Sequence, residues 1–288
     1  MSLHEQEREA PSAGRIAVMA WRSTSAAAAC TPTGFLAALA VIATAMIVER
    51  LATQTFSAAV ESSFSWSYIL KSRAVALAFE AIEGAAVALV AVPVYRLVLR
   101  EETMAAIDLL RERTLRLAAW IAAYRVLTFI LLLPSVFAKS IAAGIGTSYG
   151  MLLLYFALYG VVIQLVLLYV WARFGLLYPE VALDIPAGDR GRFRKAWQLS
   201  APVQWRIVWS AMIVFVPIYS AATALALFGN FGAGGRLHVA RGGGISWGDV
   251  IGYDVLMVAG AALGAAVLAW NYRFITGRHH ELTAETFA

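Results

Sequence analysis

The chain has 288 residues, of which 61% are hydrophobic and 14% are charged, and its formal net charge is +5. Its mean hydropathy is +0.72, whereas an average soluble domain is about half apolar and a quarter charged. This composition excludes an ordinary soluble domain, which would leave large apolar patches exposed to water. The basic residues lie in short segments between apolar runs, so we attribute the positive charge to membrane topology and not to nucleic-acid binding.

The first 33 residues are expected to form a cytoplasmic N-terminal segment. Residues 1–15 mix glutamates with arginines and contain no apolar run of the kind that a secretory signal needs. Residues 15–25 combine arginine and tryptophan with apolar side chains. We therefore expect an amphipathic stretch that lies on the membrane surface.

A membrane-spanning helix needs about 20 predominantly apolar residues. Six stretches of the chain meet this requirement, and together they predict an all-α membrane helix bundle that occupies residues 34–276. The expected spans are residues 34–51, 74–97, 117–137, 151–174, 207–227 and 250–274. Residues 277–288 then form a cytoplasmic tail.

Lysine and arginine predict the orientation of the bundle. Most of the 23 basic residues fall on one side of the expected spans, in residues 8–22, 96–116, 173–206 and 273–278. Because basic residues accumulate in cytoplasmic segments, both termini are expected in the cytoplasm.

A weak threefold pattern divides the spans into three helical hairpins. Basic segments with apolar spacing precede the first, third and fifth spans, at residues 15–25, 107–116 and 193–206. Each inward-running helix ends in aromatic and arginine residues. Internal repeats are common in membrane folds, but aromatic and basic residues also collect at any membrane interface, and both interpretations stay open.

The segment 190–206, RGRFRKAWQLSAPVQWR, is the most distinctive interfacial element. Its basic groups can meet anionic lipid headgroups while its aromatic rings enter the acyl boundary. Pro202 is expected to divide it into two pieces. The residues expected to contact lipid are Arg192, Arg194, Lys195, Trp197, Trp205 and Arg206. The alternative is a plain cytoplasmic loop that obeys the positive-inside rule.

Three charged residues fall within the expected spans. Glu80 and Glu83 share one face of the second span because they are three residues apart. Arg125, in the third span, lies at a depth similar to that of Glu83. Charges in the bilayer core are costly and often functional. Three interpretations stay open: a buried Glu83–Arg125 pair that fixes helix register, a polar path for transport, and acid–base catalysis.

Other intramembrane features are explained by helix packing. Gly260 and Gly264 form a G-x-x-x-G pattern that permits close helix approach, inside the bundle or at a dimer seam. Interhelical hydrogen bonds account for Gln164, Asp254 and Asn271. The histidines have no metal-ligand spacing, and Cys30 stands alone. We expect no metal and no cofactor.

Three stretches resemble a broad group of bacterial multi-helix membrane proteins. They are WARFGLLYPEVALD at 171–184, FRKAWQLS at 193–200 and QWRI at 204–207. The group is similar to the membrane domain found beside some glycerophosphodiester phosphodiesterases. The chain departs from it where the group has Gly-Asn before Trp-Arg, because Pro202-Val203-Gln204 stands there. The resemblance covers about a quarter of the chain and implies a bacterial inner-membrane protein with no enzymatic activity to transfer.

The sequence thus predicts a six-helix inner-membrane protein that is not an enzyme. Its expected function is that of a scaffold or accessory protein that organises membrane lipids, anionic at the cytoplasmic face, or a membrane-protein partner. The alternative function is a small transporter or channel that uses Glu80, Glu83 and Arg125.

Overall fold

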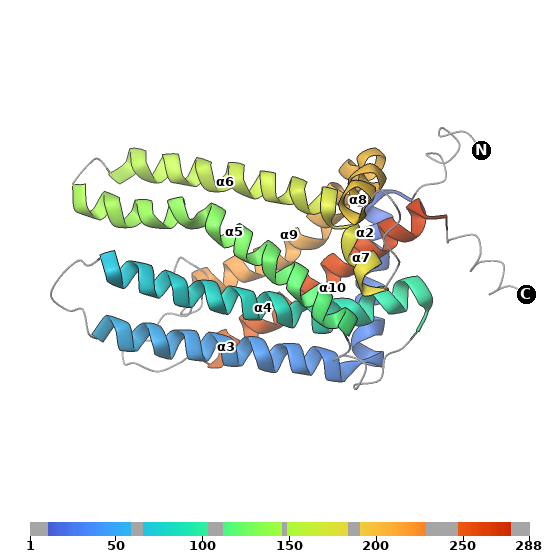
Figure 1. Ribbon diagram of the computed structural model, residues 1–288, viewed down its shortest axis with the longest axis horizontal. Coiled ribbons are helices and arrows are strands. Elements are labelled where there is room, and N and C mark those ends of the chain that lie inside the picture. Colours follow the sequence, from blue (N-terminus) through green and yellow to red (C-terminus); the bar gives the residue numbers. More distant parts are fainter. Residues whose placement is uncertain are drawn as a thin grey trace, which may run out of the picture.

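The computed structural model describes residues 11–58, 66–102, 112–145, 149–183, 191–228 and 247–277. Within these ranges every regular element is a helix, as the sequence predicted. Long helices run side by side along the longest axis of the molecule (Figure 1). They are α3 (Pro32–Ala58), α4 (Trp66–Arg100), α5 (Glu112–Ile145), α6 (Tyr149–Phe174), α9 (Gln204–Phe228) and α10 (Trp247–Ile275).

Within the residues that the structure describes, five helical runs are long and apolar enough to cross a membrane. The qualifying stretches are Pro32–Glu49, Ala74–Arg100, Glu112–Leu131, Arg192–Ile218 and Ile251–Ile275. In α6 the described side chains give the shorter apolar stretch Val162–Phe174. An all-helical bundle with several apolar spans is therefore confirmed, whereas the number six and the orientation of the ends stay predictions.

Three short helices gather at one end of the bundle, at the right of Figure 1. They are α2 (Ala13–Cys30), α7 (Leu177–Ala182) and α8 (Arg192–Ser200). The 3-10 turn Ala201–Val203 joins α8 to α9. We call these three helices the collar. Residues 278–288 of the expected cytoplasmic tail lie outside the described residues.

The first collar helix, α2, is amphipathic and packs on the bundle. Ser12 caps its N-terminus by accepting a hydrogen bond from the backbone N–H of Arg15 at 3.3 Å. Pro32 starts α3 directly after Thr31, which ends α2. The buried side chains recur every three or four residues, namely Ile16, Ala17, Ala20, Thr24 and Ala27. This stripe faces α4, α9 and α10, so the predicted surface segment 15–25 also contacts the bundle.

The two other predicted surface segments are built differently. In the second, residues 112–116 form the first turns of the long helix α5 and are not a separate element. In the third, Pro202 lies in the 3-10 turn between α8 and α9. The expected division at Pro202 therefore takes the form of a change from α-helix to a tighter turn, after which the chain remains helical.

Helices α4 and α5 form the most extensive contact of the bundle, and Gly84 permits it. A Cβ atom at Gly84 would lie 3.0 Å from the Cα of Ala122 and 3.0 Å from the Cγ of Arg125. In membranes small residues let two backbones approach closely, because packing and not the hydrophobic effect drives helix association. The α4–α5 contact thus depends on the absence of a side chain at residue 84.

We expect Gly84→Ala to lower the free energy of unfolding by about 1–3 kcal/mol, because the added methyl group overpacks a backbone contact. Gly260→Ala is the matched control, since a Cβ atom there would meet nothing closer than 3.9 Å. Reversible unfolding in mixed micelles measures the free energy of unfolding of both variants. Equal stability of the two variants would contradict this account of the α4–α5 contact.

Candidate functional site

Four consecutive residues near the end of α10 bond to four different parts of the molecule. Successive residues of an α-helix point about 100° apart, so four of them face all sides of the helix. We call residues 270–273 the hub. The bonds are Trp270 Nε1 to Ser23 Oγ at 3.0 Å, Arg206 Nε to Asn271 Oδ1 at 3.1 Å, Tyr272 Oη to Glu180 Oε1 at 3.3 Å, and Arg273 Nη1 to the Val98 carbonyl at 2.8 Å.

The hub connects the collar to the spanning helices. Ser23 belongs to α2, Glu180 to α7 and Val98 to α4, whereas Arg206 lies in the first turn of α9. The side chains of Asn271 and Tyr272 are buried. Buried polar groups are costly unless they are hydrogen-bonded, so each of these bonds also defines the position of its partner helix. The interhelical hydrogen bond expected of Asn271 is confirmed.

A second contact fastens α8 to α7. Glu180 is 1% exposed, and its Oε1 lies 2.7 Å from Nζ of Lys195, whose side chain is 39% exposed. The same oxygen accepts the hydrogen bond of Tyr272, so the ion pair is continuous with the hub. We call the Glu180–Lys195 pair the latch. Burial raises the pKa of the neighbouring Tyr178 far above its ordinary value, so that hydroxyl keeps its proton.

The latch and the hub include two of the residues expected to contact lipid headgroups, and their contact with lipid stays a prediction. Lys195 is directed toward Glu180, and Arg206 donates to Asn271. Both basic groups therefore bind protein atoms. Glu180 was not among the site residues predicted from the sequence. A single carboxylate in the apolar stretch LLYPEVAL needs a partner if that stretch is buried, so the sequence did contain an indication of its role.

The outer side of α8 and the first turns of α9 carry a row of large aromatic side chains, which we call the aromatic face. Its members are Phe193, Trp197, Trp205 and Trp209, with exposed fractions of 50, 40, 67 and 59%. Phe193 and Trp197 are four residues apart on α8, and Trp205 and Trp209 are four residues apart on α9, so the members of each pair lie on one side of their helix. Ala196, Ser200, Gln204 and Ile207 form the buried stripe of the same run.

Ring contacts hold the α8 part of the aromatic face against α5 and α6. Phe193 meets Trp120 edge-on with ring centroids 5.0 Å apart, and Trp197 lies 5.3 Å from Phe174. The guanidinium of Arg173 lies 4.4 Å from the Trp197 ring centroid. This arginine was not among the expected lipid contacts. Arg194 is exposed and Arg192 half-buried.

The charges in the spans lie where α4 meets α5. Arg125 Nη1 is 3.5 Å from Oε2 of Glu80, and the two side chains are 27% and 21% exposed. Glu83, one turn along α4, is buried and lies next to Gly84. The ion pair that the structure gives Arg125 thus joins it to Glu80, and the Glu83–Arg125 pair stays a prediction.

The glycine pattern on α10 faces the interior of the bundle. A Cβ atom at Gly264 would lie 3.1 Å from the ring of Phe215 on α9 and 3.8 Å from Trp171 on α6. At Gly260 the nearest atom is Ile218 Cδ1, at 3.9 Å. Gly264 therefore lies at a close contact with α9, whereas Gly260 does not, and the use of the G-x-x-x-G pattern stays a prediction. Among the residues that the structure describes, no group of His, Cys, Asp and Glu is arranged to hold a metal ion.

We expect Lys195→Met to lower the free energy of unfolding by about 2 kcal/mol, because it leaves the buried Glu180 carboxylate without its cation. A fully buried pair would lose about 3–5 kcal/mol, but Lys195 is partly exposed to solvent. The double variant Glu180→Gln/Lys195→Met should return to within about 1 kcal/mol of wild type, since it removes both charges together and keeps an acceptor for the Tyr272 hydroxyl. Additive losses in a double-mutant cycle would show that the two groups are not coupled.

Comparison of the chain with protein-family models, with curated proteins and with solved structures found no match.

Proposed function

We propose that the chain is an integral protein of the bacterial inner membrane that binds anionic lipids at the cytoplasmic surface through its collar. In this arrangement both described ends lie on the cytoplasmic side, and the collar lies in the headgroup region. By holding lipids there, the protein serves as a scaffold or accessory subunit for a membrane process. The proposal assigns no catalytic step to it.

The observation that carries this proposal is the aromatic face. Tryptophan and tyrosine are enriched at the membrane–water interface, because their rings are apolar and their edges are polar. Trp205 is 67% and Trp209 59% exposed, near the beginning of α9 and within the helical run Arg192–Ile218 that is apolar enough to span a membrane. In water these side chains would form an unfavourable apolar patch, whereas in the interface they anchor the collar.

The charge of the collar supports the choice of anionic lipid. Helices α2 and α8 contain no acidic residue, and their charged residues are Arg15, Arg22, Arg192, Arg194 and Lys195. The remaining collar helix, α7, carries Glu180, which pairs with Lys195, so the four arginines are in excess. Arg22 and Arg194 are exposed, so they remain available to phosphate groups. Each basic residue near an anionic membrane surface contributes about 1 kcal/mol to the attraction.

The rigidity of the collar supports a binding role. The latch holds α8, a hub bond holds α2, and ring contacts hold the aromatic face. A surface that is already ordered loses less conformational entropy when it binds. Such a surface suits a protein that organises lipids or a membrane partner. The resemblance of residues 171–207 to bacterial inner-membrane proteins agrees with this location and stays a prediction.

A transporter or channel is the second candidate function. The observation that favours it is the Glu80–Arg125 ion pair, because both side chains keep part of their surface exposed within apolar helices. Against it, the close backbone contact at Gly84 makes the pair part of a tight helix interface. Solute flux into vesicles that stops in Glu80→Gln would favour this second function.

Lipid selectivity of the purified protein tests the proposal. We expect Arg194→Gln to lower the preference for phosphatidylglycerol over phosphatidylcholine about fivefold, because one basic group leaves the surface. Gln198→Arg adds a cation to an exposed position of the same helix and should raise the preference by a similar factor. Native mass spectrometry of lipid-bound states measures both. A preference that neither variant changes would contradict the proposal.

A further inference from the structure

A line of exposed side chains runs along α6 and changes its chemical character toward the collar. Its apolar members Val162, Leu165 and Val166 are 56, 60 and 47% exposed, and Tyr169, one turn closer to the collar, is 39% exposed. Arg173 follows one turn later, in the last turn of the helix. Because residues three or four apart lie on the same side of a helix, these five residues form one continuous surface. We call it the α6 stripe.

The guanidinium of Arg173 lies in a corner between two aromatic rings. It is 4.4 Å from the ring centroid of Trp197 and 5.6 Å from that of Tyr169, and the two rings are inclined at 74° to each other. Helix α8, which carries Trp197, contacts this end of α6 (Figure 1). A cation over the face of an aromatic ring is held there electrostatically. The rings therefore fix the position of the guanidinium, and both rings remain exposed beside it.

The hydrogen bonds of Arg173 leave its charge without a counterion. Nε donates to Tyr169 Oη at 3.3 Å, and Nη1 donates to the Trp197 carbonyl at 3.5 Å. Both acceptors are neutral, and both distances exceed the usual value of about 3.0 Å. None of the ion pairs that join described residues includes Arg173. A guanidinium has about five N–H groups to donate, so most of them remain available to an anion.

The α6 stripe has the same order of chemical groups as a glycerophospholipid. In the membrane location proposed above, its apolar part lies against acyl chains, Tyr169 lies at the interface and Arg173 lies at the level of the headgroups. The 11 residues from Val162 to Arg173 rise by about 16 Å. The hydrocarbon of one leaflet is about 15 Å thick. Because a guanidinium binds phosphate through paired hydrogen bonds, the group that fits the corner is the lipid phosphodiester.

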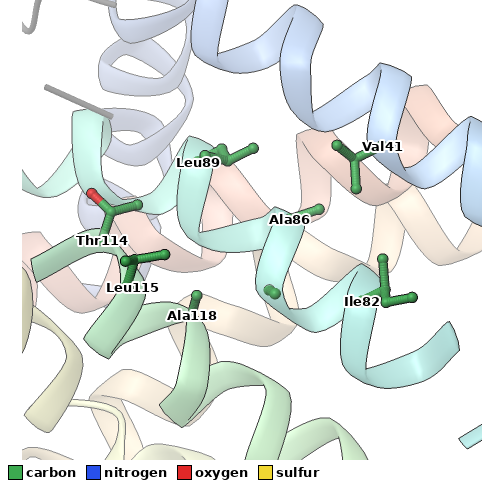
Figure 2. Close-up of a pocket in the computed structure, with 8 residues that line it drawn as sticks. Val41, Ile82, Ala86, Leu89, Thr114, Leu115 and Ala118 are labelled. Atoms are coloured by element: carbon green, nitrogen blue, oxygen red, sulfur yellow. The ribbon is translucent and has the colours of Figure 1, made fainter. Parts of the chain in front are cut away.

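The apolar groove between α3, α4 and α5 has no such end group (Figure 2). The described residues that line it are apolar, apart from Thr114, and none of them is basic. Ile82 and Leu115 are exposed at its rim. The groove thus offers acyl chains an apolar surface without a cation for the phosphate. It is the appropriate comparison surface for the α6 stripe.

We infer that the α6 stripe and the corner around Arg173 bind one glycerophospholipid, with its phosphodiester on the Arg173 guanidinium and an acyl chain along α6. The inference rests on the proposed function, because it places a single lipid at one end of the collar. It adds a recognised chemical group. The corner binds a phosphodiester, whereas the exposed arginines of the collar attract negative charge in general. Trp197 positions the cation and does not itself contact the phosphate.

Photo-crosslinking tests the site in the full chain. Phosphatidylglycerol with a diazirine on one acyl chain is added to the protein in maltoside micelles, which contain no phosphate, and labelled residues are mapped by mass spectrometry. We expect labelling at Leu165 and Val166 to exceed labelling at Ile82 and Leu115. Unlabelled phosphatidylglycerol should displace the probe from α6. Diacylglycerol has the same chains without the phosphate and should compete about tenfold less well, the effect of losing a charge-assisted hydrogen bond.

Two arginines at the same end of the molecule provide matched variants. Arg173→Gln should lower labelling of α6 about tenfold, and phosphatidylglycerol and diacylglycerol should then compete equally. Arg100 ends α4, and its Nη2 donates to the Leu183 carbonyl at 3.0 Å. Arg100→Gln removes one positive charge as well, but should leave labelling of α6 unchanged. Arg173→Lys keeps the charge without the planar fork and should retain part of the labelling.

The competitors distinguish phosphate recognition from a structural role. If Arg173 served only to hold α8, Arg173→Gln would leave the preference for phosphatidylglycerol over diacylglycerol unchanged, and the inference would be overturned. Equal labelling of α6 and the groove in the unaltered protein would overturn it too. Displacement of the probe by millimolar inorganic phosphate would assign the corner to a free anion and exclude the lipid.

The outcomes also separate this site from the proposed function. If Arg194→Gln changed the lipid preference while Arg173→Gln left labelling of α6 unchanged, lipid binding by the collar would stand without this site. Absence of labelling on both α6 and the groove would contradict the membrane location itself.

Discussion

One turn of α10 is bonded to two of the collar helices and to two of the long helices. In residues 270–273 the helical rotation of about 100° per residue directs four polar side chains toward α2, α9, α7 and α4. Apolar contacts in a bilayer give helices little preference for one another, because lipid tails are as apolar as leucine. Directional bonds at the end of a span therefore carry much of the information that places the shorter helices. The latch extends this network from α7 to α8.

Two kinds of constraint divide the molecule between its middle and its collar end. In the spans, small residues set the distance between helices, as Gly84 does against Ala122 and Gly264 against Phe215. At the collar end, buried hydrogen bonds and ion pairs set the orientation of the helices. The exposed aromatic face lies outside both networks, so its side chains are available to a second molecule. This arrangement connects the bundle to a surface with exposed aromatic side chains, which we propose faces lipid.

Hydropathy and helical periodicity predicted much of the fold. Each expected span falls within one long helix, and the amphipathic segments 15–25 and 190–206 lie in collar helices or in the first turn of α9. These features depend on local sequence, which is why they could be predicted from the sequence alone. The ion pair of Arg125 with Glu80 could not be specified from the sequence, because it depends on how α4 packs against α5 around Gly84, which is a long-range contact.

In the candidate site too, the features that depend on local sequence were predicted and the long-range contacts were not. Exposed aromatic and basic residues of α8 were found from their spacing, but Lys195 and Arg206 were assigned to lipid because their partners lie far away in sequence. Glu180 and Asn271 are separated from these cations by 15 and 65 residues. No local sequence pattern connects such pairs. A single sequence can therefore indicate that a buried polar group needs a partner, but it does not identify the partner residue.

Hydrogen exchange of the reconstituted protein tests most directly whether the hub holds the collar. Asn271→Leu removes the acceptor of Arg206 and keeps the size of the side chain. We predict that amide exchange in residues 192–210 becomes about tenfold faster, the effect of losing one charge-assisted hydrogen bond, while exchange in α3 is unchanged. No acceleration in residues 192–210, or equal acceleration in α3, would contradict a hub that fastens the collar to the bundle.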